Sequence, residues 1–290
     1  MLNKIVSVNP ETRNSMNSRV VANYAKLQPS LFLLPLFLVL ALVLFLYCQE
    51  ALSIEKYILI QKNLFYFLNA KFSQFPNLIY NLTQFGDALV FLSLLSILIL
   101  FAPKMWEALL SASVVSAILS GVLKNFFAVP RPAAAFDPHS FVIIGKTLAG
   151  HNSLPSGHSI TIFTVLTVLA FALMPKKMIH RIFWFFCIAI AGVTLVFTRV
   201  GVGAHYPLDV LSGSMTGWIS GLTGIFITKK YKIWSWISNR KYHPIFILLF
   251  LICGIALTKK IADENLIIYY LALLGLLVSL FKLTYEYVKK

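Results

Sequence analysis

The feature that most constrains this chain is its series of long apolar runs. A membrane-spanning helix needs about 20 mostly apolar residues. Eight segments approach that length, at 31–48, 79–101, 107–123, 158–174, 182–198, 209–228, 244–258 and 266–283. Charged residues make up only 12% of the sequence, against about 25% in soluble proteins. The sequence therefore predicts an all-α, polytopic helical membrane protein and excludes a soluble enzyme.

The positions of the basic residues predict the orientation. Cytoplasmic loops of membrane proteins carry an excess of Lys and Arg, and this chain has 25 such residues against 10 acidic ones. If the N-terminus is cytoplasmic, most of them fall in cytoplasmic segments. We therefore expect a multi-pass protein of the cell membrane, the inner membrane in a bacterium, with both termini in the cytoplasm. A nucleic-acid partner is excluded, because the basic residues are scattered among short loops with no contiguous basic face.

Two segments on the predicted outer side are long. Residues 49–78 mix apolar and polar residues, and we expect part of 54–75 to be an amphipathic helix lying on the membrane surface. Residues 124–157 are rich in Pro, Gly, His and Ser and connect the third and fourth spans. The three cysteines fall inside apolar stretches without metal-binding spacing, so we assign them to packing.

Three polar clusters stand at the predicted outer ends of spans, where helix packing could bring them around one pocket. The first begins after the third span, the second precedes the fourth, and the third joins the fifth to the sixth. Their candidate functional residues are Lys124 and Arg131, then Ser156, Gly157 and His158, then Arg199, His205 and Asp209.

The residue types in these clusters suit a phosphate group. Lys124, Arg131 and Arg199 offer three cations, and the arginine fork matches phosphate oxygens in pairs. Backbone N–H groups of Ser156 and Gly157 would point out of a helix N-terminus, which is a ready anion site. Phosphate binding by these residues is therefore expected.

The two histidines supply the remaining chemistry. Phosphoryl transfer through the enzyme needs a nucleophile and an acid for the leaving group, and His205 and His158 can fill these roles. Asp209 follows His205 by four residues, and Pro207 between them favours the first turn of a helix. A carboxylate there can hold one ring nitrogen of His205 as N–H and leave the other free to attack.

The pattern Lys-x6-Arg-Pro, Pro-Ser-Gly-His and Arg-x5-His-x3-Asp resembles the three-part signature of the type 2 phosphatidic acid phosphatase family. That superfamily includes lipid phosphate phosphatases and vanadium haloperoxidases. The resemblance implies His205 as the nucleophile and His158 as the general acid. Thr198 departs from the usual serine of the family but keeps the hydroxyl.

The resemblance also implies an architecture and a reaction. The usual family core has six spans, so we expect an N-terminal cytoplasmic segment at 1–30, a six-span phosphatase core at 31–228, and a C-terminal extension at 229–290 with two further spans. It implies hydrolysis of a lipid phosphate at the outer, periplasmic or extracellular, face through a phosphohistidine, without metal or other cofactor. The sequence carries no HExxH motif, Asp-rich cluster or Cys-His ligand set. The sequence does not predict an oligomeric state.

Several alternatives remain open at this point. The lipid could be undecaprenyl diphosphate, phosphatidylglycerophosphate or phosphatidate, or lipid A. A phosphotransferase that passes the group to an acceptor lipid would share every motif residue. A transporter is disfavoured because its polar residues would cluster at mid-membrane, and a haloperoxidase because those enzymes are soluble. Asp87 is a further candidate, which either orients a site residue or caps a helix turn. We interpret His139 and His151 as solvated loop residues, with substrate contact as the second possibility.

Overall fold

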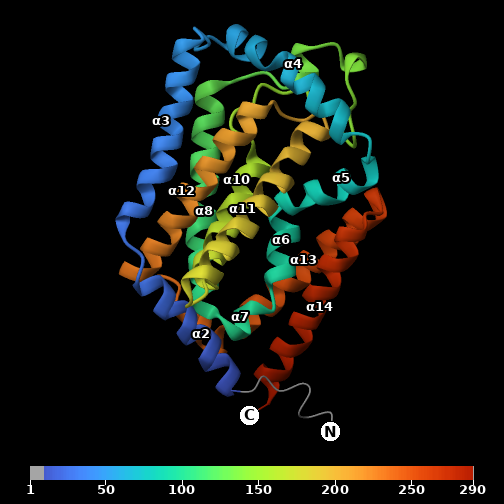
Figure 1. Ribbon diagram of the computed structural model, residues 1–290. Coiled ribbons are helices and arrows are strands. Elements are labelled where there is room, and N and C mark those ends of the chain that lie inside the picture. Colours follow the sequence, from blue (N-terminus) through green and yellow to red (C-terminus); the bar gives the residue numbers. More distant parts are fainter. Residues whose placement is uncertain (1–9, 290) are drawn as a thin grey trace.

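Long apolar helices run the height of the molecule in this computed structural model, which describes residues 10–289 (Figure 1). Within that range six helices are long and apolar enough to cross a membrane, and no strand occurs, so the predicted all-α membrane fold is confirmed. Residues 1–9 of the expected N-terminal segment and Lys290 lie outside the described residues. The six helices are α3 (Leu33–Cys48), α8 (Pro103–Phe127), α11 (Met178–Gly201), α12 (Pro207–Lys230), α13 (His243–Glu264) and α14 (Ile267–Val288).

Shorter helices connect these six or pack among them. Several begin with proline in the first turn, where its missing N–H costs no hydrogen bond. They are α2 (Pro10–Ala25), η1 (Pro29–Phe32), α4 (Ile54–Phe72), α5 (Pro76–Thr83), η2 (Gln84–Gly86), α6 (Ala88–Leu95), α7 (Leu98–Phe101), α9 (Pro132–Ala135), η3 (Pro138–Ser140), α10 (Gly157–Ala172), η4 (Ser235–Ser238) and η5 (Arg240–Tyr242).

Helix α10 is the centre of the bundle. It carries apolar or small residues on every side, as a helix surrounded by others does. Its 16 residues give a length of about 24 Å at 1.5 Å per residue. Helices α8, α11 and α12 pack around it. The segment predicted as the fourth span is therefore a short, buried helix whose N-terminus is fixed by its neighbours.

Close approach of α12 to α10 depends on glycine. A Cβ atom on Gly213 would lie 2.6 Å from the carbonyl oxygen of Ser156, and one on Gly217 would lie 2.4 Å from that of Ile160. Both distances are far inside van der Waals contact, so any side chain there would push the helices apart. Small residues at helix interfaces serve the same purpose in other membrane proteins.

The second predicted span, 79–101, is not one continuous helix. It is divided into α5, η2, α6 and α7, and the chain bends by 77° between Pro76–Gly86 and Ala88–Leu95. The cause is Asp87, which takes an extended conformation and accepts a hydrogen bond from the N–H of Leu89 at 2.9 Å, so that it starts a new helix. The two parts together are long and apolar enough to cross a membrane as one bent span, so the predicted second span is broken and not continuous.

Helix α4 forms where an amphipathic helix was expected, and it runs across the top of the bundle in Figure 1. One face of α4 is buried at four-residue intervals, through Tyr57, Gln61, Phe65 and Asn69. Phe65 packs against aromatic rings from the connecting loop and from the start of α12. This face therefore covers the ends of the other helices. Its position relative to a membrane surface stays a prediction.

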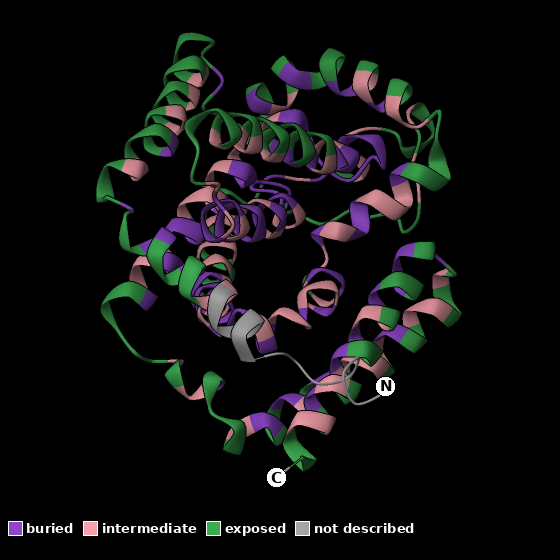
Figure 2. Ribbon diagram, turned by 60° about the horizontal axis from the view of Figure 1, so that its bottom comes forward, coloured by how far each residue is buried: buried purple, intermediate pink, exposed green. Residues whose placement is uncertain are grey.

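The two C-terminal helices build a second apolar core. Helices α13 and α14 pack on each other, and α14 also packs on α6. Figure 2 shows that burial is concentrated where helices face one another, while their outer faces are exposed. Those outer faces carry many large apolar side chains, such as Phe37, Ile255 and Leu274, as contact with lipid tails requires. The division at residue 229 into core and extension stays a prediction.

Candidate active site

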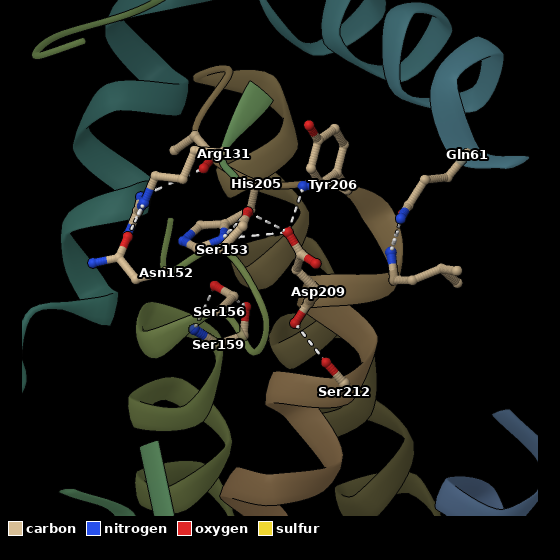
Figure 3. Close-up of polar contacts among 12 residues, drawn as sticks. Gln61, Arg131, Asn152, Ser153, Ser156, Ser159, His205, Tyr206, Asp209 and Ser212 are labelled. Carbon is tan, nitrogen blue, oxygen red and sulfur yellow. Dashed lines mark hydrogen bonds and ion pairs between the residues drawn. The ribbon is translucent and has the colours of Figure 1, made fainter. Parts of the chain in front are cut away.

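The turn between α11 and α12 places His205. Gly203 in this turn has a φ of 75°, a left-handed conformation that glycine adopts without strain. Proline at the start of α12 then puts Asp209 in the first turn, where its Oδ2 accepts the N–H of Tyr206 at 3.0 Å. The Nδ1 atom of His205 lies 3.6 Å from the same Oδ2 (Figure 3).

Both oxygens of the Asp209 carboxylate have further donors. Tyr57 from α4 donates to Oδ1 at 2.7 Å, and Ser153 from the loop before α10 donates to Oδ2 at 2.6 Å. Ser153 Oγ also lies 3.4 Å from Nδ1 of His205. These contacts fix the Nδ1 edge of the imidazole ring, so Nε2 is the nitrogen left on the opposite edge.

Two arginines are buried beside this pair. Arg131 is 8% exposed and donates from Nε to Asn152 at 2.7 Å and from Nη1 to the carbonyl of Ala204 at 3.4 Å. Arg199 is 6% exposed and donates from Nη1 to Thr83 at 2.9 Å. Among the described residues the buried Nε of Arg199 has no hydrogen-bond partner. A buried donor of this kind is costly unless a ligand satisfies it.

Lys124, in the last turn of α8, completes the cationic set. Its Nζ lies 3.0 Å from the position that a Cβ on Gly157 would occupy. The lysine therefore approaches the first residue of α10 closely, and the absence of a side chain at Gly157 makes room for it. This contact brings the first and second predicted clusters together at one helix end.

The second cluster caps α10. Ser156 is the N-cap, and its hydroxyl accepts from the N–H and the hydroxyl of Ser159 at 3.4 and 2.9 Å. The N–H of Ser156 donates to the carbonyl of Asp209 at 3.0 Å, so it is already bonded. Gly157 and His158 supply the next two N–H groups, which an α-helix leaves without intrahelical partners.

The side chain of His158 packs against Gly86 in the bent segment formed by η2 and α6. A Cβ atom on Gly86 would lie 2.4 Å from Cβ of His158 and 2.6 Å from its ring. The bend at Asp87 therefore lets a glycine backbone support this histidine. Asp87 itself caps α6 and pairs with Lys260 at 2.9 Å, and among the described residues no hydrogen bond or ion pair joins it to a site side chain. The side chains of His139 and His151 are exposed.

The surroundings set the protonation of two groups. Burial, followed by the positive charges of Arg131, Arg199 and Lys124, lowers the pKa of His205 well below 6.5, which favours the neutral imidazole. Burial and the carboxylate of Asp209 raise the pKa of Tyr57, so that its hydroxyl stays a donor. The site therefore combines an uncharged imidazole with three nearby cationic side chains.

Sequence reasoning missed four residues that hold the site: Tyr57, Thr83, Asn152 and Ser153. Asn152 and Ser153 come three and two residues before Pro155, so their position just ahead of the second cluster was a usable signal. Tyr57 and Thr83 lie far outside the three clusters. For Tyr57 the signal was the four-residue spacing of polar and aromatic residues in α4. Thr198, which stands where the resembled family usually has serine, donates from its hydroxyl to the carbonyl of Leu195 within α11.

Comparison with known proteins yields one family and several relatives. A family model described as the PAP2 superfamily matches residues 106–233, which contain every residue of the three clusters. A lipid A 1-phosphatase of Rhizobium etli is 33% identical over 168 residues, 50% of this chain and 68% of that protein. An undecaprenyl-diphosphatase of Sulfolobus acidocaldarius is 30% identical over 198 residues, 66% of this chain and 87% of that protein. A crystal structure of Aquifex aeolicus LpxE is 27% identical and covers 59% of this chain and 96% of its own, with a TM-score of 0.47.

Proposed function

The chain belongs to the PAP2 superfamily and is a membrane lipid phosphatase, and we propose that it acts at the outer leaflet through a phosphohistidine intermediate. Its substrate would be a phosphomonoester or diphosphate of a membrane lipid. The observation that carries this proposal is the fixed Nδ1 edge of His205, which lies 3.6 Å from Asp209 beside the buried side chains of Arg131 and Arg199.

The first step forms the phosphohistidine. Nε2 of His205 attacks phosphorus, and the bond between phosphorus and the lipid oxygen breaks. His158 donates a proton to that oxygen, so the lipid leaves as an alcohol, or as a monophosphate if the substrate is a diphosphate. Asp209 stabilises the imidazole as it becomes cationic, which is the role of the carboxylate in Ser-His-Asp triads.

The second step regenerates the enzyme. His158, now neutral, takes a proton from a water molecule, whose oxygen attacks phosphorus as the bond to Nε2 breaks. Inorganic phosphate leaves, and His205 returns to its neutral form. The low pKa of free His205 supports this return, because burial and three nearby cations disfavour a protonated ring.

Charge neutralisation in both steps is assigned to side chains. A transferring phosphoryl group carries negative charge on its oxygens, which cations and N–H groups stabilise when they are already in position. Lys124, Arg131 and Arg199 would supply the cations, and the buried Nε of Arg199 is a donor ready for a phosphate oxygen. The N–H groups at the start of α10 would add the helix dipole. We propose that no metal is needed.

The outer-leaflet location rests on the basic residues. With the site on the outer face, the Lys and Arg residues at the other end of the bundle face the cytoplasm, as is typical of membrane proteins. Reporter fusions after residue 145 and after residue 235 test this orientation. They should give opposite signals, the first external and the second cytoplasmic. Equal signals would contradict the outer-leaflet site.

The substrate is tested with purified protein and a panel of lipids. The relatives are named for lipid A and for undecaprenyl diphosphate, so both belong in the panel, with phosphatidylglycerophosphate and phosphatidate. Release of free phosphate from at least one lipid is expected. Phosphate that appears on an acceptor lipid instead would identify a phosphotransferase. A preference for soluble phosphate esters over every lipid would contradict the proposal.

A further inference from the structure

A hollow lies in the half of the bundle away from His205. It has a volume of about 640 Å³ and is enclosed by η1 and α3 on one side and by α10, α11 and α12 on the other. Its walls are almost entirely apolar, with Leu31, Leu34, Phe163, Leu166, Phe185 and Ile188 among the lining residues. We refer to it as the lateral groove.

The lateral groove exists because α3 stands apart from the bundle. Among the residues of α3 only Pro35 is buried, and α3 packs mainly on α12. The space between α3 and α11 therefore stays open to the side. In a membrane protein such a space is filled by lipid chains, because a dry void would lose the dispersion contacts of all its lining atoms.

A basic pocket adjoins the groove at the end of α10. Its volume is about 660 Å³, and it shares Lys26 with the groove. None of the described residues lining either hollow is acidic, and none of these cations pairs with a carboxylate within the described range. The titratable residues that line the pocket are Arg19, Lys26, Lys176, Lys177 and His180.

The wall of the basic pocket is fixed by contacts between α2 and α10. Asn23 is 5% exposed and donates to the carbonyls of Ala172 and Met174 at 2.9 and 3.0 Å. Arg19 donates from Nη2 to the carbonyl of Leu173 at 3.1 Å. These bonds satisfy the last carbonyls of α10, whose partial negative charge would otherwise repel an anion. The wall of the basic pocket is therefore fixed before any ligand binds.

We propose that the lateral groove and the basic pocket together bind one anionic phospholipid. Its acyl chains lie in the groove, and its headgroup phosphate contacts Lys26, Lys176 and Lys177. Charge complementarity selects an anionic lipid, since basic pockets between membrane helices at a cytoplasmic surface are suited to such headgroups. The 16 residues of α10 separate the basic pocket, where the headgroup lies, from the start of α10 by about 24 Å. The phosphate of the bound lipid is therefore too far from His205 to be its substrate, and the proposal does not rest on the proposed reaction.

Native mass spectrometry of the full chain in detergent tests the proposal. The probes are phosphatidylglycerol and phosphatidylcholine with identical acyl chains. Neither carries a phosphomonoester, so binding is measured without turnover. The first variant is Lys26→Gln with Lys176→Gln and Lys177→Gln. Its matched control is Lys230→Gln with Lys232→Gln and Lys241→Gln, three exposed lysines at the same end that lie outside both hollows. A second variant, Ala189→Trp, fills the groove from an exposed position on α11.

We expect a monomer that retains one phosphatidylglycerol in preference to phosphatidylcholine. The first variant should weaken this binding at least about tenfold while its control leaves it unchanged, and Ala189→Trp should weaken it without any change of charge. Equal retention of the two lipids, or equal loss in the control, would overturn the proposal. Full displacement by inorganic phosphate would assign the pocket to a soluble anion instead. A dimer that Ala189→Trp converts to monomer would assign the groove to a second copy of the chain.

Discussion

Tyr57 and Asp209 lie 152 positions apart in the sequence, yet the Tyr57 hydroxyl donates a 2.7 Å hydrogen bond to Oδ1 of Asp209. Ser153 donates to the other oxygen at 2.6 Å, so the carboxylate is held from two sides. Tyr57 belongs to α4, outside the residues that match the family model. The helix that covers the bundle is therefore also part of the support for His205.

Replacing Tyr57 with Phe should lower kcat about tenfold and leave KM nearly unchanged. The substitution keeps the ring and removes a donor to a buried carboxylate, and such charged hydrogen bonds contribute about 1.5–3 kcal/mol. Because Asp209 acts through His205, the loss should appear in the chemical step. Steady-state kinetics on a lipid monoester measure it.

The matched control for this experiment is Tyr66→Phe. Tyr66 is on the same helix, but its hydroxyl contacts the exposed Ser140 at 2.7 Å. This variant should keep the activity of the unmodified protein. A Tyr57→Phe protein with full kcat would show that the hydroxyl does not support catalysis. A melting temperature that falls in Tyr57→Phe and not in the control would show that the hydroxyl supports folding.

The sequence predicted the three clusters because their chemistry is concentrated at fixed spacing. His205 comes directly before Tyr206, the N-cap of α12, and Asp209 lies in the first turn of that helix, so the two side chains meet at the helix start. Tyr57 could not be assigned in the same way. A polar and aromatic stripe at four-residue intervals is typical of a helix at a membrane surface, and it is equally typical of a helix that covers a site.

The bend at Asp87 illustrates a second limit. Apolar residues occur on both sides of Asp87, more densely after it than before it, so the hydropathy of 79–101 predicts one span. The break depends on the carboxylate of Asp87, which caps α6 and does not face the site. It also depends on the ion pair between Asp87 and Lys260, which belongs to a helix far along the chain. Long-range partners of this kind leave no periodic signal in the sequence.

Substituting Gly86 with Ala should displace His158. The new Cβ atom would lie 2.4 Å from Cβ of His158, so one of the two segments must move. We expect hydrolysis of a lipid monoester to fall at least about tenfold, because general acid catalysis typically contributes 10²–10⁴-fold and depends on position. Gly121→Ala is the control, since no atom lies within 4 Å of its Cβ position. Equal activity of the two variants would show that His158 tolerates the shift.

The pH profile should report the cationic surroundings of His205. Its lowered pKa keeps the ring neutral below the usual 6.5, so the acid limb of kcat/KM should lie under that value. Arg131→Gln removes one positive charge, which raises this pKa and should shift the acid limb to higher pH. The exposed Lys146→Gln serves as the control. All variants are measured on the same lipid substrate, so the ionisation of the substrate affects each profile equally. A difference between two profiles therefore comes from the enzyme. If the acid limb of Arg131→Gln lay at the same pH as that of the unmodified protein, the limb would have to be assigned to a group other than His205.

Activity should survive a chelator and be inhibited by vanadate. Lys124, Arg131 and Arg199 are expected to neutralise the phosphoryl oxygens, so EDTA has no required ion to remove. Vanadate takes a trigonal-bipyramidal geometry and should bind as an analogue of the transition state. Phosphate release with and without each reagent provides the measurement. Loss of activity in EDTA that Mg²⁺ restores would require a different mechanism.

The roles of the two histidines can be distinguished with substrates whose leaving groups differ in quality. In the proposed mechanism, replacing His205 removes the nucleophile, so no phosphoenzyme can form from any substrate. Replacing His158 would then remove only the acid that protonates the leaving oxygen. A lipid alkoxide is a poor leaving group and depends on that proton, whereas p-nitrophenolate leaves readily without it.

His158→Ala should therefore retain a larger fraction of its activity on p-nitrophenyl phosphate than on a lipid monoester, while His205→Ala should lose both. Asp209→Asn should fall between them, because its amide can still accept from Tyr57 or Ser153 but carries no charge to stabilise the cationic imidazole. The ratio of the two rates for each variant is the quantity to compare, with melting temperatures as the check on folding. If folded His158→Ala failed on the activated ester as completely as His205→Ala, His158 would have to act on the phosphoryl group itself and not on the leaving oxygen.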